Sequence, residues 1–80
     1  MIGKINECIS NALGLPISAV SALDNDELLT EFGLDSLHFI QLIVILEEAF
    51  DIEVLDSDLL MVNFINKANI YDILRKYVDN

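Results

Sequence analysis

Apolar residues recur every three or four positions in three stretches of this chain, and this spacing places them on one side of an α-helix. The stretches cover residues 2–13, 37–50 and 70–78. Gly14 and Pro16 end the first, because glycine commonly terminates a helix and proline cannot continue one. The pattern therefore predicts three main helices and an all-α fold.

The connections between these helices are long enough to hold short elements of their own. Residues 17–35 contain apolar anchors that we expect to be buried: Val20, Leu23, Leu28, Leu29, Phe32 and Leu34. Beyond Asp51, Asp56 or Ser57 is a suitable cap for a short helical piece. The apolar residues of that piece are Leu59, Leu60 and Val62. We therefore predict a four-helix bundle of three main helices and one short helix.

A chain of 80 residues with 54% apolar side chains has room for one core, so we expect a single domain over residues 1–80. Small domains are often stabilised by disulfides or zinc, but the single cysteine excludes an internal disulfide and a cysteine-cluster zinc site. That residue, Cys8, lies on the apolar side of the first helix, which predicts a packed core thiol. Helix packing must therefore stabilise the domain.

The charge is strongly acidic, since 14 Asp and Glu residues against 4 Lys and Arg give a net charge of −10. No Lys or Arg occurs between Lys4 and Lys67. Such a chain repels nucleic acid and anionic membranes and attracts basic protein surfaces. The longest apolar run, residues 42–46, is too short to cross a bilayer, so we expect no membrane insertion and a cytoplasmic protein.

Asp24 and Asp26 resemble the start of a calcium-binding loop. However, Leu28 and Leu29 occupy positions where that loop requires a ligand and a turn glycine. We therefore predict no metal site in this chain.

The second helix has two apolar sides. On a helical wheel the core side gathers Phe39, Leu42, Ile43, Leu46 and Phe50. A different side, directly under Ser36, carries Leu37, Ile40 and Val44 and is edged by Glu47, Glu48 and Asp51. An apolar stripe with an acidic edge and a serine at its top is typical of a docking surface for a partner.

Ser36 is the strongest candidate for chemistry. It follows a glycine and begins a helix, where free N–H groups and the positive end of the dipole favour an attached phosphate. The sequence around it, Phe-Gly-Leu-Asp-Ser-Leu at positions 32–37, resembles the attachment motif of acyl carrier proteins. The resemblance continues through Leu42, Leu46-Glu47-Glu48 and Phe50-Asp51-Ile52-Glu53 to Phe64, Asn66 and Ile70, and so covers nearly the whole chain.

This resemblance implies a right-handed four-helix bundle with a short third helix and a covalent 4'-phosphopantetheine on Ser36. A phosphopantetheinyl transferase would attach that arm from coenzyme A, using magnesium of its own. The resemblance also implies a transferase recognition role for Asp35, and the candidate partner contacts are Leu37, Ile40, Val44, Glu47 and Glu48. Their partners would be loading and condensing enzymes with basic docking surfaces, and the carrier itself would be a monomer and not an enzyme.

The cargo is open, because fatty acid, polyketide and nonribosomal peptide carriers share this scaffold. A stand-alone peptidyl or D-alanyl carrier is the alternative. Carriers of bacterial fatty acid synthesis are usually acidic at the positions of His38 and Gln41, so this chain departs from that pattern in two places. The departure favours a carrier dedicated to a specialised pathway.

An enzyme is the competing class, because Ser36 and His38 offer a nucleophile and a base. Residues two apart point to different sides of a helix, and the sequence indicates no third group that orients the imidazole. We therefore predict no catalytic residue and a partly exposed His38. An acidic adaptor without a prosthetic group is a third class, which shares the helices and the charge but needs no serine at this position.

Overall fold

The computed structural model describes residues 1–78, and they form an all-α fold without a strand in that range. The four α-helices are α1 (Ile2–Leu13), α2 (Ile17–Ala22), α3 (Ser36–Phe50) and α4 (Lys67–Val78). Three short 3-10 helices complete the described chain: η1 (Leu29–Phe32), η2 (Asp56–Asp58) and η3 (Met61–Phe64). The predicted fold class and all three main helices are confirmed.

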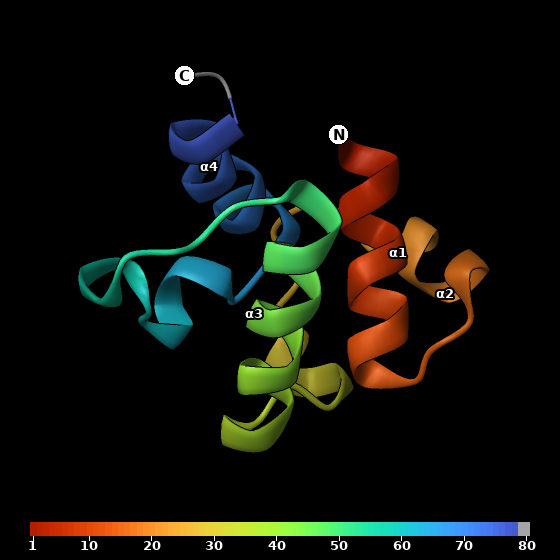
Figure 1. The fold of residues 1–80 in the computed structure, drawn as a ribbon. Coiled ribbons are helices and arrows are strands. Elements are labelled where there is room, and N and C mark those ends of the chain that lie inside the picture. Colours follow the sequence, from red (N-terminus) through yellow and green to blue (C-terminus); the bar gives the residue numbers. More distant parts are fainter. Residues whose placement is uncertain (79–80) are drawn as a thin grey trace.

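Helices α1 and α3 lie side by side and run in opposite directions (Figure 1). The first turn of α3, in yellow-green, lies at the end of the molecule opposite the N-terminus and the last turn of α4. The segment that contains η2 and η3 covers another side of α3. This arrangement leaves the beginning of α3 at a tip of the domain.

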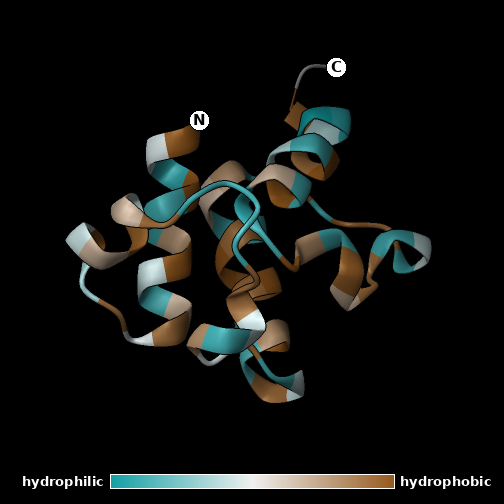
Figure 2. Ribbon diagram, turned by 180° about the vertical axis from the view of Figure 1, so that it is seen from behind, coloured by the Kyte–Doolittle hydropathy of each residue, from teal (hydrophilic) through white to brown (hydrophobic). Residues whose placement is uncertain are grey.

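The core is built from the facing sides of the main helices. In Figure 2 the ribbon of α1 alternates between hydrophobic and hydrophilic residues, as an amphipathic helix requires. The largest fully buried side chains are Phe64, Ile5, Ile9, Leu29, Leu42, Leu46, Ile70, Leu74 and Val20. Cys8 is buried among them as predicted, and burial raises the pKa of its thiol. This thiol is therefore a packing group.

The short helix lies at a different place from the one predicted. The segment after Asp51 forms η2 and η3 instead of one short α-helix, with Leu59 and Leu60 between them. No side chain caps η2. Instead, the Tyr77 hydroxyl of α4 accepts from the Leu55 N–H at 3.1 Å and donates to the Asp58 carboxylate. These tertiary bonds hold the segment in tight turns, and the short α-helix of the fold is α2.

The connection before α3 has fewer buried anchors than predicted. Val20, Leu29 and Leu34 are buried, whereas Leu28 and Phe32 are exposed. The Leu29 N–H donates to the Ile65 carbonyl at 2.8 Å, and the Leu29 side chain turns into the core. The preceding residue has an extended backbone, so its side chain points the other way.

Helix α4 begins at Lys67, directly after Asn66, whose side chain accepts the Asn69 N–H at 2.8 Å. Lys67 is buried, with 7% of its surface exposed, and no sequence pattern predicts this. Its ammonium donates to the Leu23 carbonyl at 2.9 Å, and desolvation lowers its pKa. The bond anchors the start of α4 on the connection that leads to the tip of α3.

Candidate functional site at the beginning of helix α3

A glycine turn and a buried leucine set the direction in which the chain enters α3. Gly33 has φ 110°, a conformation that side-chain-bearing residues rarely adopt. Leu34 is 3% exposed and anchors the turn in the core. Asp35 is the N-cap, and its side chain accepts the His38 N–H at 2.9 Å. Ser36 is therefore fixed as the first helical residue.

Ser36 is exposed at the tip of the domain. The N–H groups of Ser36 and Leu37 have no hydrogen-bond partner within residues 1–78, as is usual for the first turn of a helix. These donors and the positive end of the dipole of a 15-residue helix favour a negatively charged group on the serine oxygen. The surroundings of Ser36 thus fit a phosphodiester.

The structure places Asp35 against the ring of His38. The distance between Asp35 Oδ1 and His38 Nδ1 is 2.7 Å, so the imidazole is oriented by a carboxylate that the sequence analysis missed. The two residues occupy the N-cap and N3 positions, whose side chains are neighbours in a capping box, and this spacing is the signal for the contact. The His38 backbone and side-chain hydrogen bonds lower the pKa of Asp35.

The predicted docking side of α3 lies outside the core. Leu37, Ile40 and Val44 are 62%, 61% and 47% exposed, so three large apolar side chains of one helix face away from the bundle. Glu48 and Gln41 are exposed as well. We call the surface formed by Leu37, Ile40, Val44 and Glu48 the outer face of α3.

Glu47 differs from the other predicted contacts because it is half-buried and has a bond within the fold. Its Oε2 accepts the Val54 N–H at 2.9 Å. Asp51, at the C-terminus of α3, has φ 53° and leads the chain into this segment. Between them runs a shallow groove lined by Val44, Glu47, Glu48, Asp51, Ile52 and Glu53. The acidic end of the outer face is therefore a concave surface.

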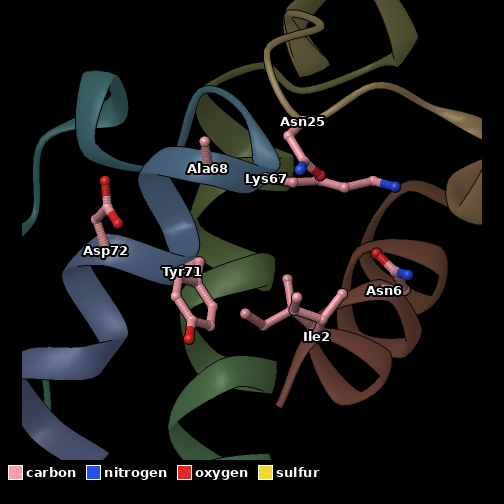
Figure 3. Close-up of a pocket in the computed structure, with 8 residues that line it drawn as sticks. Ile2, Asn6, Asn25, Lys67, Ala68, Tyr71 and Asp72 are labelled. Carbon is pink, nitrogen blue, oxygen red and sulfur yellow. The ribbon is translucent and has the colours of Figure 1, made fainter.

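A cavity of about 300 Å³ lies elsewhere, between α1, α4 and the turn at Asn25 (Figure 3). Ile2 and Tyr71 form apolar parts of its wall, and Ile2 is 57% exposed. No residue of α3 lines this cavity, so it is separate from Ser36. Within residues 1–78 no helix is long and apolar enough to cross a membrane. The same residues contain no group of three His, Cys, Asp or Glu side chains that could hold a metal ion.

The chain is similar to known proteins over most of its length. The family model described as the phosphopantetheine attachment site matches residues 3–67. The acyl carrier protein of Buchnera aphidicola subsp. Baizongia pistaciae is 37% identical over 76 residues, covering 94% of this chain and 91% of that protein. The acyl carrier protein of Buchnera aphidicola subsp. Schizaphis graminum is 35% identical over 65 residues, covering 81% of this chain and 80% of that protein.

A third relative, the acyl carrier protein of Syntrophobacter fumaroxidans, is 34% identical over 73 residues, covering 91% of this chain and 85% of that protein. No solved protein structure matches the chain. The family model spans most of the helices described above, and the relatives span most of the chain. The chain therefore belongs to the acyl carrier protein family, as a phosphopantetheine-bearing carrier and not an enzyme.

Proposed function

We propose that Ser36 is the residue that carries the 4'-phosphopantetheine arm. The observation that supports this best is the position of Ser36, which is exposed as the first residue of α3 and directly followed by the outer face. An arm attached there would begin at the tip of the domain, outside the core. Its terminal thiol supplies the thioester bond to the cargo, while the outer face remains free to contact the enzyme that acts on that cargo.

Attachment requires coenzyme A as the second substrate. The Ser36 oxygen bonds to the phosphorus that bears the pantetheine, and the bond from that phosphorus to the adenosine nucleotide breaks. A base on the transferase takes the serine proton. The helix N-terminus stabilises the resulting phosphodiester charge through the free N–H groups of the first turn.

Membership in this family implies a phosphopantetheinyl transferase and acyl-handling enzymes as partners. We propose that they contact the outer face with basic surfaces. Glu47 and Glu48 lie in the last turn of α3, where an acidic side chain interacts unfavourably with the helix dipole. That turn contains no basic residue of its own, although the Lys4 ammonium of α1 donates to the Ala49 carbonyl there. Glu47 also accepts the Val54 N–H within the fold, so the exposed charge of Glu48 is the one that best suits an electropositive partner.

Gln41 and His38 lie on the exposed part of α3 near Ser36 and support the proposal of a specialised pathway. Enzymes that expect two carboxylates there would meet an amide and an imidazole instead. We propose polyketide or nonribosomal peptide assembly in preference to general fatty acid synthesis, with a stand-alone peptidyl or D-alanyl carrier as the alternative. That this carrier acts as a single domain over residues 1–80, as a monomer and in the cytoplasm stays a prediction.

The experiment that tests Ser36 is modification of the purified apo-protein with coenzyme A, magnesium and a broad-specificity transferase. We expect one added phosphopantetheine by intact-mass spectrometry and no addition to Ser36→Ala. Ser57 provides the matched control, because it is also exposed and also follows an aspartate. Ser57→Ala should be modified like the wild type. Modification of Ser36→Ala, or no modification of the wild type while a known carrier is loaded, would contradict the proposal.

A further inference from the structure

The carboxylate beside the proposed attachment site is already engaged by a titratable side chain. Asp35 Oδ1 accepts the His38 backbone N–H at 2.9 Å and lies 2.7 Å from His38 Nδ1. Both side chains reach solvent, since 65% of the Asp35 and 36% of the His38 side-chain surface is exposed. A transferase that approaches Ser36 therefore meets the pair, and not an isolated aspartate.

The charge of this pair depends on one proton. The low pKa of Asp35 keeps its carboxylate ionised throughout the range from about pH 5 to about pH 8, in which histidine side chains usually titrate. With a neutral imidazole the pair carries one negative charge, and Nδ1–H donates to Asp35. With an imidazolium the pair is neutral overall, although the geometry of the contact is preserved.

We propose that His38 sets the rate at which Ser36 is modified, because its protonation neutralises the Asp35 carboxylate that an electropositive transferase recognises. The proposal rests on Ser36 being the attachment site. His38 acts through Asp35 and is therefore a positioning and specificity residue, not a catalytic one. Modification of Ser36 should slow as the pH falls from about 8 to about 5.5, because histidine side chains in general become protonated in this range.

The elements packed against α3 carry few charges that compete for His38. Helix α1 has Lys4 and Glu7, and the Lys4 ammonium donates to the Ala49 carbonyl near the opposite end of α3. The buried Cys8 thiol is held neutral by its raised pKa. Segment η3 has no ionisable residue, and η1 contributes the exposed Glu31. Within residues 1–78 the ionisable group in contact with His38 is Asp35.

The test is a competition between the wild type and His38→Gln for limiting transferase in one tube, read by mass. Both chains compete for the same enzyme and the same coenzyme A. The pH dependence of the transferase itself therefore cancels in the ratio of the two modification rates. Glutamine is uncharged at every pH used, and the backbone N–H at position 38 that Asp35 accepts remains. We expect a ratio near one at about pH 8 that falls by about two- to fivefold at about pH 5.5.

Two further variants test the contact itself. His38→Lys carries a permanent charge and should be modified more slowly than His38→Gln at both pH values. Gln41→His in the His38→Gln background moves the imidazole along the exposed part of α3 and away from Asp35, so its ratio to His38→Gln should change with pH by less than the wild-type ratio does. A flat ratio for the wild type, or an equal pH dependence for the moved histidine, would overturn the inference. Failure of the proposed attachment site is distinct, because then neither competing chain would be modified at Ser36.

Discussion

The two sides of α3 carry similar residues and have opposite environments. On the inner side Leu42 and Leu46 are fully buried, whereas Leu37 and Ile40 on the outer face are more than half exposed. Composition alone does not separate them, because both sides contain leucine and isoleucine. Burial on the inner side accounts for the fold, and the exposed apolar side chains on the other side are the kind that mark interaction sites.

The two glutamates at the end of α3 also differ in their environments. Glu48 is exposed on the outer face at the end of α3 that disfavours negative charge, so it does not stabilise the helix. Glu47, one residue earlier, accepts a backbone hydrogen bond from Val54 and fixes the path of the chain after the helix. These two neighbouring glutamates therefore have different roles, and a variant of each serves as the control for a variant of the other.

The largest expected difference is in folding stability between the two sides. We expect Leu46→Ala to lower the free energy of unfolding by about 2–5 kcal/mol, because it removes a fully buried side chain and leaves a cavity. Ile40→Ala on the outer face should change it by less than about 0.5 kcal/mol, since alanine also favours the helix. Urea unfolding followed by circular dichroism measures both values.

A matched and milder pair keeps this comparison valid if Leu46→Ala fails to fold. Ile43→Val removes one methylene from a side chain that is 7% exposed and should cost about 0.5–1.5 kcal/mol. Ile40→Val makes the same chemical change on the outer face and should cost less than about 0.5 kcal/mol. Equal losses for the two variants would show that the outer face also supports the fold.

The next difference, of intermediate size, separates the two glutamates. Glu47→Gln should lower the free energy of unfolding by about 1 kcal/mol, because the Val54 N–H loses a charged acceptor. Glu48→Gln should leave it unchanged or raise it slightly, but should weaken binding of a basic partner and reduce the salt dependence of that binding. The stability of both variants is measured by urea unfolding. Their binding to a condensing enzyme is measured by titration at two salt concentrations. An unaltered salt dependence for Glu48→Gln would remove Glu48 from the docking surface.

Much of the fold was predictable because local signals and burial agree. The periodic apolar residues of α1 and α4 and the end of α1 at Gly14 lie where the sequence predicts. The division of α3 into two sides also follows from its helical period alone. That division predicts the stripe beside Ser36, and its apolar residues Leu37, Ile40 and Val44 are exposed.

The remainder depends on contacts that are distant in the sequence or involve side-chain geometry. The bonds of Tyr77 to Leu55 and Asp58 hold the segment after α3, and no local pattern there distinguishes two tight turns from one short helix. The burial of Lys67 likewise requires the Leu23 carbonyl, 44 residues away. The Asp35–His38 contact was missed for another reason, because the wheel compares sides of a helix and the N-cap lies before its first turn.

The smallest expected effect concerns the two uncharged positions near Ser36. We compare the modified wild type with a His38→Asp, Gln41→Glu variant as substrates for a malonyl transferase and a ketosynthase of fatty acid synthesis. Each of the two introduced carboxylates should contribute about 0.2–1 kcal/mol to binding of the enzyme, so the variant should react several-fold faster. Its free energy of unfolding should change little. Leu37 and Ile40 are unchanged in the variant, so any gain in rate is due to charge and not to the apolar stripe.

A wild type that already reacts as fast as a standard fatty acid carrier, with no gain from the two substitutions, would contradict this prediction. It would mean that these enzymes recognise the apolar stripe and tolerate the missing carboxylates. In that case the departures at His38 and Gln41 would carry no information about the pathway.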